Sequence, residues 1–562
     1  MTNTTPIDKL PYERYDIKLV EQATEKFVEA EKNARSAEDV LKAREELLAT
    51  LEHFDTMASL SYTRYTLNTY DEFYIKEQAY YDEVMPIFGM CTSKIAECLL
   101  KSRFKDELKK RLPETIFPNL ELAAKCHSPE TVEDEQEENA IVTEYSALMS
   151  QLTTDWRGEK KTISFIRGFF ESKDREERKE AANAIGRALE SVADQLDDIY
   201  DRLVKVRTRI AKKLGYKDFV ELGYYRMGRI DYDRDMVAKF RQNVLEDIVP
   251  VVSKLKADVK EGLGIDKFMF YDDGVIPGGN PVPKVDAQGI LDAARDMYDD
   301  MHPEASKLMR QMLSVGAIDP LPRDGKWGGG YATTFPDFKQ TFILGNFTGT
   351  SDDIDLVTHE FGHTFAMNFA FEHDQEAGIG SSETAETHSM SMEFFAWKYL
   401  DKFFEDAKGY KLKHLDGCFS FIPYGVIVDE FQHIMYEQPE LSPAERNKVY
   451  LELEKKYRPY LSFDGIEYLE KGTRWQYQMH IYESPFYYID YCLAQVVALE
   501  FLSESQKDYD EAFARYVEHC KRGGLFAFNH LVRLAGLKSP FEDGALKEVA
   551  KTSTKLIDEL KR

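Results

Sequence analysis

Cysteine is rare in this chain of 562 residues. The six cysteines are Cys91, Cys98, Cys126, Cys418, Cys492 and Cys520. No two of them stand in a C-x-x-C pair, so the pattern favours neither a disulfide framework nor a thiolate zinc site. We therefore expect free thiols in a reducing compartment.

Long hydrophobic runs are also missing. No stretch approaches the ~18 to 20 consecutive apolar residues that a membrane-spanning helix needs. Residues 1–9 lack the basic start and the following apolar run of a secretory signal. The sequence thus predicts no membrane partner and a cytoplasmic location.

Positive charge is in the minority. The chain has 73 basic and 100 acidic residues, which gives a formal net charge of -27. Such a surface argues against nucleic acid or an anionic membrane as the main partner.

The glycines at 328–330 are not followed by Gly-Lys-Ser/Thr, so they do not form a phosphate loop.

Helical periodicity dominates the rest of the chain. Residues 16–111 show the spacing of long antiparallel helices, and residues 175–214 read as one long amphipathic helix closed by Gly215. A further helix is predicted over 233–259, while the prolines and acidic run of 112–135 indicate a break between subdomains. With 43% hydrophobic residues, the chain can bury a large core.

One region has strand character. Segments 330–335 and 340–347 flank Pro336-Asp337, a pattern that predicts a β-hairpin. An exposed edge of this hairpin could bind a peptide by strand pairing, which would read the peptide's backbone.

The strongest chemical signal lies in residues 352–368. On a helix, His359 and His363 stand one turn apart on one face. The opposite, core-facing side carries Val357, Phe361 and Phe365. Thr350 and Asp353 have the spacing of a capping box, which predicts a helix start near residue 351.

This spacing is typical of a catalytic zinc site. Two imidazoles at i and i+4 can share one Zn2+, and Glu360 can take a proton from a water in the open coordination position. The alternative is that two histidines and a glutamate fall at this spacing by chance. The start signal, the apolar back face and the acidic helix that follows favour the metal site.

A third protein ligand is expected from the segment after the metal helix. Helical spacing places several acids on one stripe there, and spacing alone leaves four candidates open. They are Glu383, Glu386, Glu393 and His388.

Several motifs together resemble a known family. His359-Glu-Phe-Gly-His is preceded by Gly349-Thr and followed by Glu386-Thr-His-Ser-Met-Ser-Met-Glu-Phe-Phe. This combination resembles the oligoendopeptidase F branch of the thimet oligopeptidase family of zinc metallopeptidases. The resemblance continues through Lys326-Trp-Gly-Gly-Gly-Tyr, Asn346-Phe-Thr-Gly-Thr, and His480-Ile-Tyr-Glu-Ser-Pro-Phe-Tyr-Tyr-Ile-Asp-Tyr, and covers at least residues 200–545.

The resemblance implies that Glu386 is the third ligand of one Zn2+ per chain. It also implies a mainly α fold in which two helical lobes enclose a deep substrate channel, with a small β element beside the zinc helix. We expect an N-terminal helical domain over 1–200 and a catalytic domain over 201–562. Short unfolded peptides would be the substrates.

Oxyanion stabilisation is predicted from the segment after residue 479. Ser484 and Pro485 fit a helix N-cap and first position, after which Tyr488 and Tyr491 share one face. By similarity, His480 and Tyr488 are the leading donors to the oxyanion, followed by Tyr491. The alternative is that individual tyrosines of this segment, such as Tyr482, Tyr487 or Tyr491, only pack in the core, since the chain has 32 tyrosines.

Other polar residues have supporting or structural interpretations. Asp355 or Glu393 could orient a ligating imidazole. The histidines His373, His388 and His433 are interpreted as structural. The predicted function is a zinc oligoendopeptidase with Glu360 as general base, and the alternatives are a zinc carboxypeptidase or a non-catalytic peptide-binding scaffold.

Overall fold

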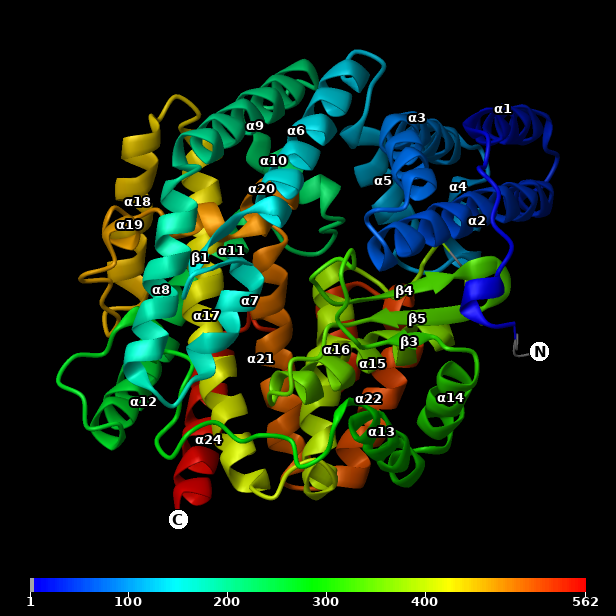
Figure 1. The fold of residues 1–562 in the computed structure, drawn as a ribbon. Helices are drawn as coiled ribbons and strands as arrows, with labels where there is room; N and C mark the ends of the chain where they lie inside the picture. Colours follow the sequence, from blue (N-terminus) through cyan, green and yellow to red (C-terminus); the bar gives the residue numbers. More distant parts are fainter. Residues whose placement is uncertain (1–4, 375) are drawn as a thin grey trace.

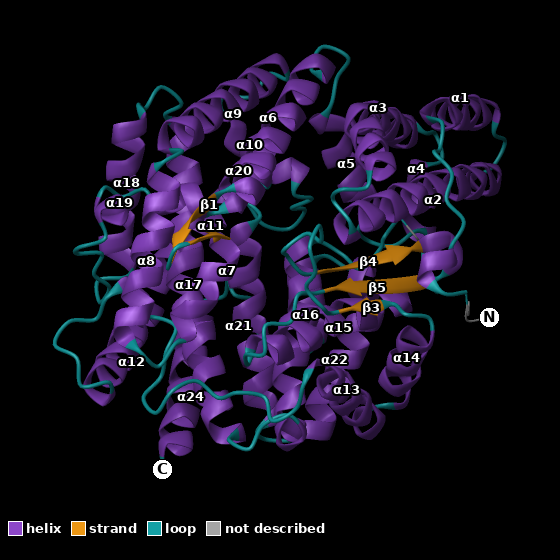
Figure 2. Ribbon diagram, viewed as in Figure 1, coloured by secondary structure: helices purple, strands orange, loops and turns teal. Residues whose placement is uncertain are grey.

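The computed structural model describes residues 5–374 and 376–562, and Figure 1 shows that helices dominate it. In Figure 2 the strands are confined to two small regions, a sheet of two strands and a sheet of three. The prediction of a mainly α fold with a small β element is therefore confirmed. No helix in these residues is long and apolar enough to cross a membrane.

Five helices form the N-terminal part of the molecule. They are α1 (Ile17–Asn33), α2 (Ala37–Leu67), α3 (Glu72–Lys101), α4 (Lys105–Arg111) and α5 (Ile116–Cys126). Helix α5 occupies the segment 112–135 that was predicted to be a break. Pro118 is tolerated because it lies in the first turn, where its missing N–H has no partner to lose.

A second group of elements follows. These are α6 (Val132–Gln151), β1 (Thr153–Trp156), β2 (Glu159–Thr162), α7 (Ile163–Arg167), α8 (Arg175–Glu190), α9 (Ala193–Lys213), α10 (Phe219–Arg226), α11 (Arg234–Asn243) and α12 (Val249–Gly262). The prediction of a single helix over 175–214 is wrong, because the helix is interrupted at Ser191 and Val192. Both pieces bury their apolar faces, so periodicity gives no sign of the break. Gly215 follows the last turn of α9 with a φ of 88°, as predicted.

The helix predicted over 233–259 is present with one irregular turn. Between α11 and α12, residues Val244–Ile248 form a turn of π-helix, and the helical run then continues to Gly262. Pro250 lies just after this π turn and has no N–H to donate, so it interrupts the backbone hydrogen-bond ladder where the irregular turn occurs.

The predicted β-hairpin is confirmed. The elements here are α13 (Ala287–Met301), α14 (Pro303–Ser314), β3 (Ile318–Asp319), β4 (Tyr331–Phe335), β5 (Gln340–Leu344), α15 (Asp352–Ala370) and α16 (Ser382–Phe395). β4 pairs antiparallel with β5, with Tyr331 opposite Leu344, and β3 pairs parallel with the other side of β5. β4 is thus an outer strand of this sheet, and β5 is buried along its whole length.

The C-terminal part returns to helices. They are α17 (Ala407–Glu437), α18 (Pro443–Tyr457), α19 (Glu467–Glu470), α20 (Met479–Glu483), α21 (Tyr488–Ser505), α22 (Tyr509–Arg522), α23 (Phe528–Leu534) and α24 (Ala545–Lys561). The prediction that Ser484 and Pro485 begin a helix is wrong. They lie in the bend before α21, where Phe486 has a φ of 68°, and the helix starts at Tyr488.

The helices gather on two sides of the molecule in Figure 1. One side carries α6, α8, α9 and α17 to α20, and the other carries α1 to α5 above the three-stranded sheet, α15 and α16. Arg44 of α2 ties the N-terminal helices to the segment after α15 through ion pairs with Asp374 and Glu376. The channel between two lobes and the domain division at residue 200 stay predictions; α9 is continuous across that position.

Candidate metal centre and active site

Helix α15 begins at Asp352, close to the predicted start, but its cap differs from the prediction. The N-cap residue Ser351 makes no capping hydrogen bond through its side chain. The Asp353 carboxylate accepts from the backbone N–H groups of Thr348 and Gly349 instead of closing a capping box with Thr350. This places its negative charge in the first turn, where the helix dipole favours it.

The two faces of α15 have the expected character. Val357, Phe361 and Phe365 are buried in the core. The rings of His359 and His363 lie one turn apart, with centroids separated by 5.0 Å. The helix therefore presents two imidazoles from a side opposite its apolar face.

Gly362 allows the next helix to come very close. A Cβ atom at this position would lie 2.6 Å from the Cα of Ser389 and 2.7 Å from the carbonyl oxygen of His388, both on α16. No side chain fits between the two backbones there. The glycine between the two histidines is thus what lets α16 approach α15.

This approach brings Glu386 to the two imidazoles. Its Oε2 lies 3.3 Å from Nε2 of His359 and 3.4 Å from Nε2 of His363. The ligand atoms of the three residues all lie within 4.8 Å of one another. The other third-ligand candidates point elsewhere: Glu383 accepts from Ser381, and the His388 ring packs on His519.

Glu393 contacts the ring nitrogen of His359 that does not face Glu386. The Nδ1 of His359 lies 2.7 Å from Oε1 of Glu393, and Nε2 of His414 lies 2.7 Å from its other oxygen. Trp397 donates to Nδ1 of His414 at 3.0 Å. A proton on Nδ1 leaves Nε2 of His359 free as a ligand. Asp355, the other candidate for this role, accepts a hydrogen bond from Tyr410.

The electrostatics of the cluster suit a cation. Burial lowers the pKa of His359, but hydrogen bonds to Glu386 and Glu393 outweigh it and hold that pKa well above its usual value. Burial opposes ionisation of Glu386, yet the two histidines keep its pKa well below normal. Two imidazoles and one carboxylate are the donors that Zn2+ prefers, and three protein ligands leave a coordination position open. These residues therefore fit a catalytic zinc.

Glu360 lies on the same helix between the two imidazoles in sequence. Its side chain is buried, and its Oε2 has no hydrogen-bond partner among the residues that the structure describes. Burial raises the pKa of this carboxyl, while His359 and His363 act in the opposite direction. A buried carboxylate with one unpartnered oxygen beside a ligand cluster is placed to accept a proton.

The segment around α21 adds phenols to the site. Tyr487 donates to Oε1 of Glu386 at 2.5 Å, a contact that the sequence does not reveal because the two residues lie far apart in the chain. Burial and the nearby Glu386 charge together raise the pKa of Tyr491 well above its usual value. Tyr488 packs in an aromatic group, with its ring 4.9 Å from that of His480 and 5.7 Å from that of Tyr424.

A directional chain of hydrogen bonds fixes His480. Arg474, which can only donate, binds the Tyr424 oxygen at 2.6 Å, so the phenol proton points to Oε1 of Gln478 at 2.6 Å. The Gln478 amide then donates to Nδ1 of His480, 2.7 Å away. The proton of the neutral ring is left on Nε2. Burial keeps the ring neutral by lowering its pKa to about 4, against the opposing effect of Glu386.

Two of the histidines interpreted as structural have hydrogen-bond partners outside the ligand cluster. His373 contacts the carbonyl oxygen of Lys521 through Nε2 at 2.6 Å. His433 contacts the Tyr224 hydroxyl at 3.0 Å. Neither belongs to the ligand cluster.

Comparisons with known proteins agree with this geometry. Residues 7–127 match the peptidase M3 N-terminal domain, and residues 296–551 match peptidase family M3. PZ peptidase A, solved with an inhibitor, is 41% identical with a TM-score of 0.96, and the match covers 98% of this chain and 99% of that one. The chain belongs to peptidase family M3. It is therefore a metalloendopeptidase.

Two further structures assign the chain to the oligoendopeptidase F branch of this family. A structure described as oligoendopeptidase F is 40% identical with a TM-score of 0.95, over 99% of both chains. A structure described as an oligoendopeptidase F from Bacillus anthracis strain Ames is 38% identical with a TM-score of 0.91, and the match covers 100% of both chains. No protein among the curated ones matches the sequence.

Proposed function

We propose that this M3 peptidase is a zinc-dependent oligoendopeptidase that hydrolyses internal bonds of short, unfolded peptides. The observation that carries the proposal is the buried, unpartnered oxygen of Glu360 beside three converging ligand atoms, those of His359, His363 and Glu386. The outer strand β4 supports a peptide substrate, because its outer edge pairs with no further strand of the described residues and can pair with an extended backbone.

Each residue has a role in this mechanism. His359, His363 and Glu386 hold the metal, which when bound supplies Lewis acidity that lowers the pKa of a water and polarises the scissile carbonyl. Glu360 accepts the proton of the attacking water and passes it to the leaving amine. No covalent bond between enzyme and substrate is required.

The developing oxyanion needs hydrogen-bond donors. His480 is suited to this role because the chain from Arg474 leaves its proton on Nε2, and a ring that stays neutral does not titrate near pH 7. Tyr488 and Tyr491 are the proposed phenol donors. The charge of Glu386 contributes to the raised pKa of Tyr491, which favours Tyr491 as the phenol nearer to the metal ligands. Such a donor is worth about 3 to 4 kcal/mol in the transition state.

Glu360→Gln tests the proposal. The amide keeps the size of the side chain but cannot accept the proton, so turnover of a blocked peptide should be lost while zinc binding is retained. Peptide cleavage and metal content are measured on the same preparation. Full activity in a zinc-loaded variant would contradict the mechanism.

A cytoplasmic location is part of the proposal. All six cysteines are unpaired, and five of them are buried, as expected for a protein of a reducing compartment.

A further inference from the structure

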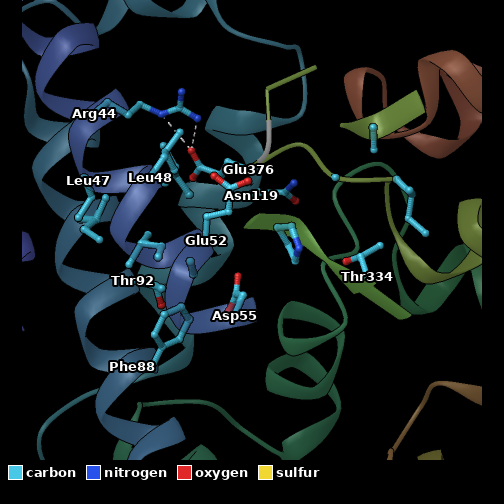
Figure 3. Close-up of a pocket in the computed structure, with 18 of the residues that line it drawn as sticks. Arg44, Leu47, Leu48, Glu52, Asp55, Phe88, Thr92, Asn119, Thr334 and Glu376 are labelled. Atoms are coloured by element: carbon cyan, nitrogen blue, oxygen red, sulfur yellow. Dashed lines mark hydrogen bonds and ion pairs between the residues drawn. The ribbon is translucent and has the colours of Figure 1, made fainter. Parts of the chain in front are cut away.

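A cavity of about 460 Å³ lies beside the metal helix. Its walls come from α2, α3 and α5 on one side and from β4 and the last turns of α15 on the other. Figure 3 shows Glu52 and Asp55 projecting from α2 toward the side of the cavity that carries Thr334 of β4.

The cavity lies along the same face of α15 as His359 and His363. The positions of α15 that are only partly buried include His359, His363, Met367 and Ala370, which form one stripe at helical spacing. Met367 and Ala370 line the cavity. Met367 is one turn beyond His363, a rise of about 6 Å, which is about two residues of an extended peptide.

The walls combine apolar surface with carboxylates. Leu47, Leu48 and Leu51 of α2 form an apolar strip. Arg44 is the cation of the cavity wall within the described residues, and its ion pairs with Asp374 and Glu376 already neutralise it.

Asp55 is the acidic group of the cavity that we expect to bind a ligand. It lines the cavity with an exposed side chain and makes no hydrogen bond or ion pair with the rest of the described chain. Although the side chain is open to the cavity, the dense walls around it desolvate the carboxylate, and this effect, helped by the neighbouring charge of Glu52, raises its pKa to about 7. A cation bound here would be stabilised by both carboxylates without competing with a protein partner of Asp55.

We propose that this cavity is a substrate subsite for a lysine or arginine side chain two or three residues away from the cleaved bond. The alkyl chain lies along Leu47, Leu48 and Leu51, and the cationic head binds Asp55. The inference rests on the proposed peptidase function and adds a preference to it. The ammonium could also come from the amino terminus of a peptide, so the test separates these two sources.

The test uses end-blocked peptides of about ten residues that differ at one position. Lysine replaces norleucine, its uncharged counterpart, at each position up to four residues on either side of the cleaved bond. We expect the ratio of kcat/KM for the lysine peptide to that for the norleucine peptide to be about ten at one position two or three residues from that bond. In Asp55→Asn this ratio should fall to about one.

Glu45→Gln is the matched control, because Glu45 is an exposed acid on the same helix and outside the cavity. This variant should keep the ratio of the unmodified enzyme. Loss of the ratio in both variants would show a long-range charge effect and overturn the subsite.

The outcomes separate this inference from the proposed function. If the unmodified enzyme cleaves no peptide, the function is wrong. If it cleaves the norleucine peptide but shows no lysine preference, or keeps the preference in Asp55→Asn, the subsite is wrong. A norleucine peptide with a free amino terminus is assayed beside the blocked ones. If only this peptide gives the Asp55-dependent gain, the cavity binds a terminal amine and the side-chain proposal is overturned.

Discussion

Glu393 links two imidazoles at the centre of the molecule. One of its oxygens holds His359, and the other holds His414, whose remaining nitrogen accepts from Trp397. The ligand is therefore fixed in both orientation and tautomer before any metal binds. Pre-orientation of this kind lowers the cost of forming the site.

Replacing Glu393 should weaken metal binding. In Glu393→Gln the carboxylate partner of His359 is lost, and we expect zinc affinity to fall about 10- to 100-fold. Competition with a chromophoric chelator measures the affinity. Glu372→Gln, at an exposed glutamate, is the control that should change nothing. Equal affinity of both variants would mean that Glu393 does not orient the ligand.

The hydrogen-bond chain to His480 makes a second prediction. Gln478→Glu puts an acceptor where the amide donates, so the imidazole should turn to its other tautomer or gain a proton. We expect kcat to fall about tenfold or more, with KM and zinc content nearly unchanged, because the donor acts in the transition state. Steady-state kinetics on a blocked peptide give both constants. An unchanged kcat would remove the chain from the mechanism.

At the scale of elements, the contact between α15 and α16 sets the geometry of the ligand cluster. The close approach depends on Gly362, which lies between the two histidines. Any side chain there forces the helices apart and moves Glu386 away from the imidazoles. Stability and metal affinity should therefore depend on the same residue.

Gly362→Ala tests this coupling. The added methyl group clashes with the backbone of α16, so we expect a loss of about 1 to 3 kcal/mol of stability together with weaker zinc binding. Thermal unfolding of the metal-free protein and a zinc titration measure the two effects. Gly417→Ala is the control, because nothing lies within 4 Å of its Cβ position in α17. Wild-type zinc affinity in Gly362→Ala would show that the helix spacing is not limiting.

Local sequence pattern was sufficient for the elements whose signals are local. The metal helix, its apolar face and the hairpin before it follow from spacings within a few residues. The break between α8 and α9 was missed because both helices bury a face in the same periodic phase. The start of α21 was misplaced because Ser484 and Pro485 resemble a cap, whereas the left-handed Phe486 delays the helix.

For the site, too, the sequence pattern predicted only the arrangement of residues that share one helix. His359, His363 and Glu360 share one helix, so their arrangement could be read from the sequence. Spacing alone could not choose among the acids of α16, because the choice depends on how two helices pack. The contacts of Glu393 with His414 and of Tyr487 with Glu386 join segments far apart in the chain and have no local signal.

At the scale of the whole molecule, the N-terminal helices are part of the catalytic architecture. α2 supplies one wall of the cavity beside the metal helix, and Arg44 ties it to the segment that follows α15. We expect a substrate to enter between these helices and the strand β4 to reach the metal, an entrance that would admit an extended peptide and exclude a folded protein.

Mass spectrometry of an end-blocked peptide of about ten residues tests the central claim most directly. The purified protein is incubated with the peptide and, separately, with a folded protein, with and without a chelator. We predict internal cleavage of the peptide alone, stopped by the chelator and restored by zinc. No cleavage of the blocked peptide, with trimming of a peptide that has a free C-terminus, would contradict the account and indicate a carboxypeptidase.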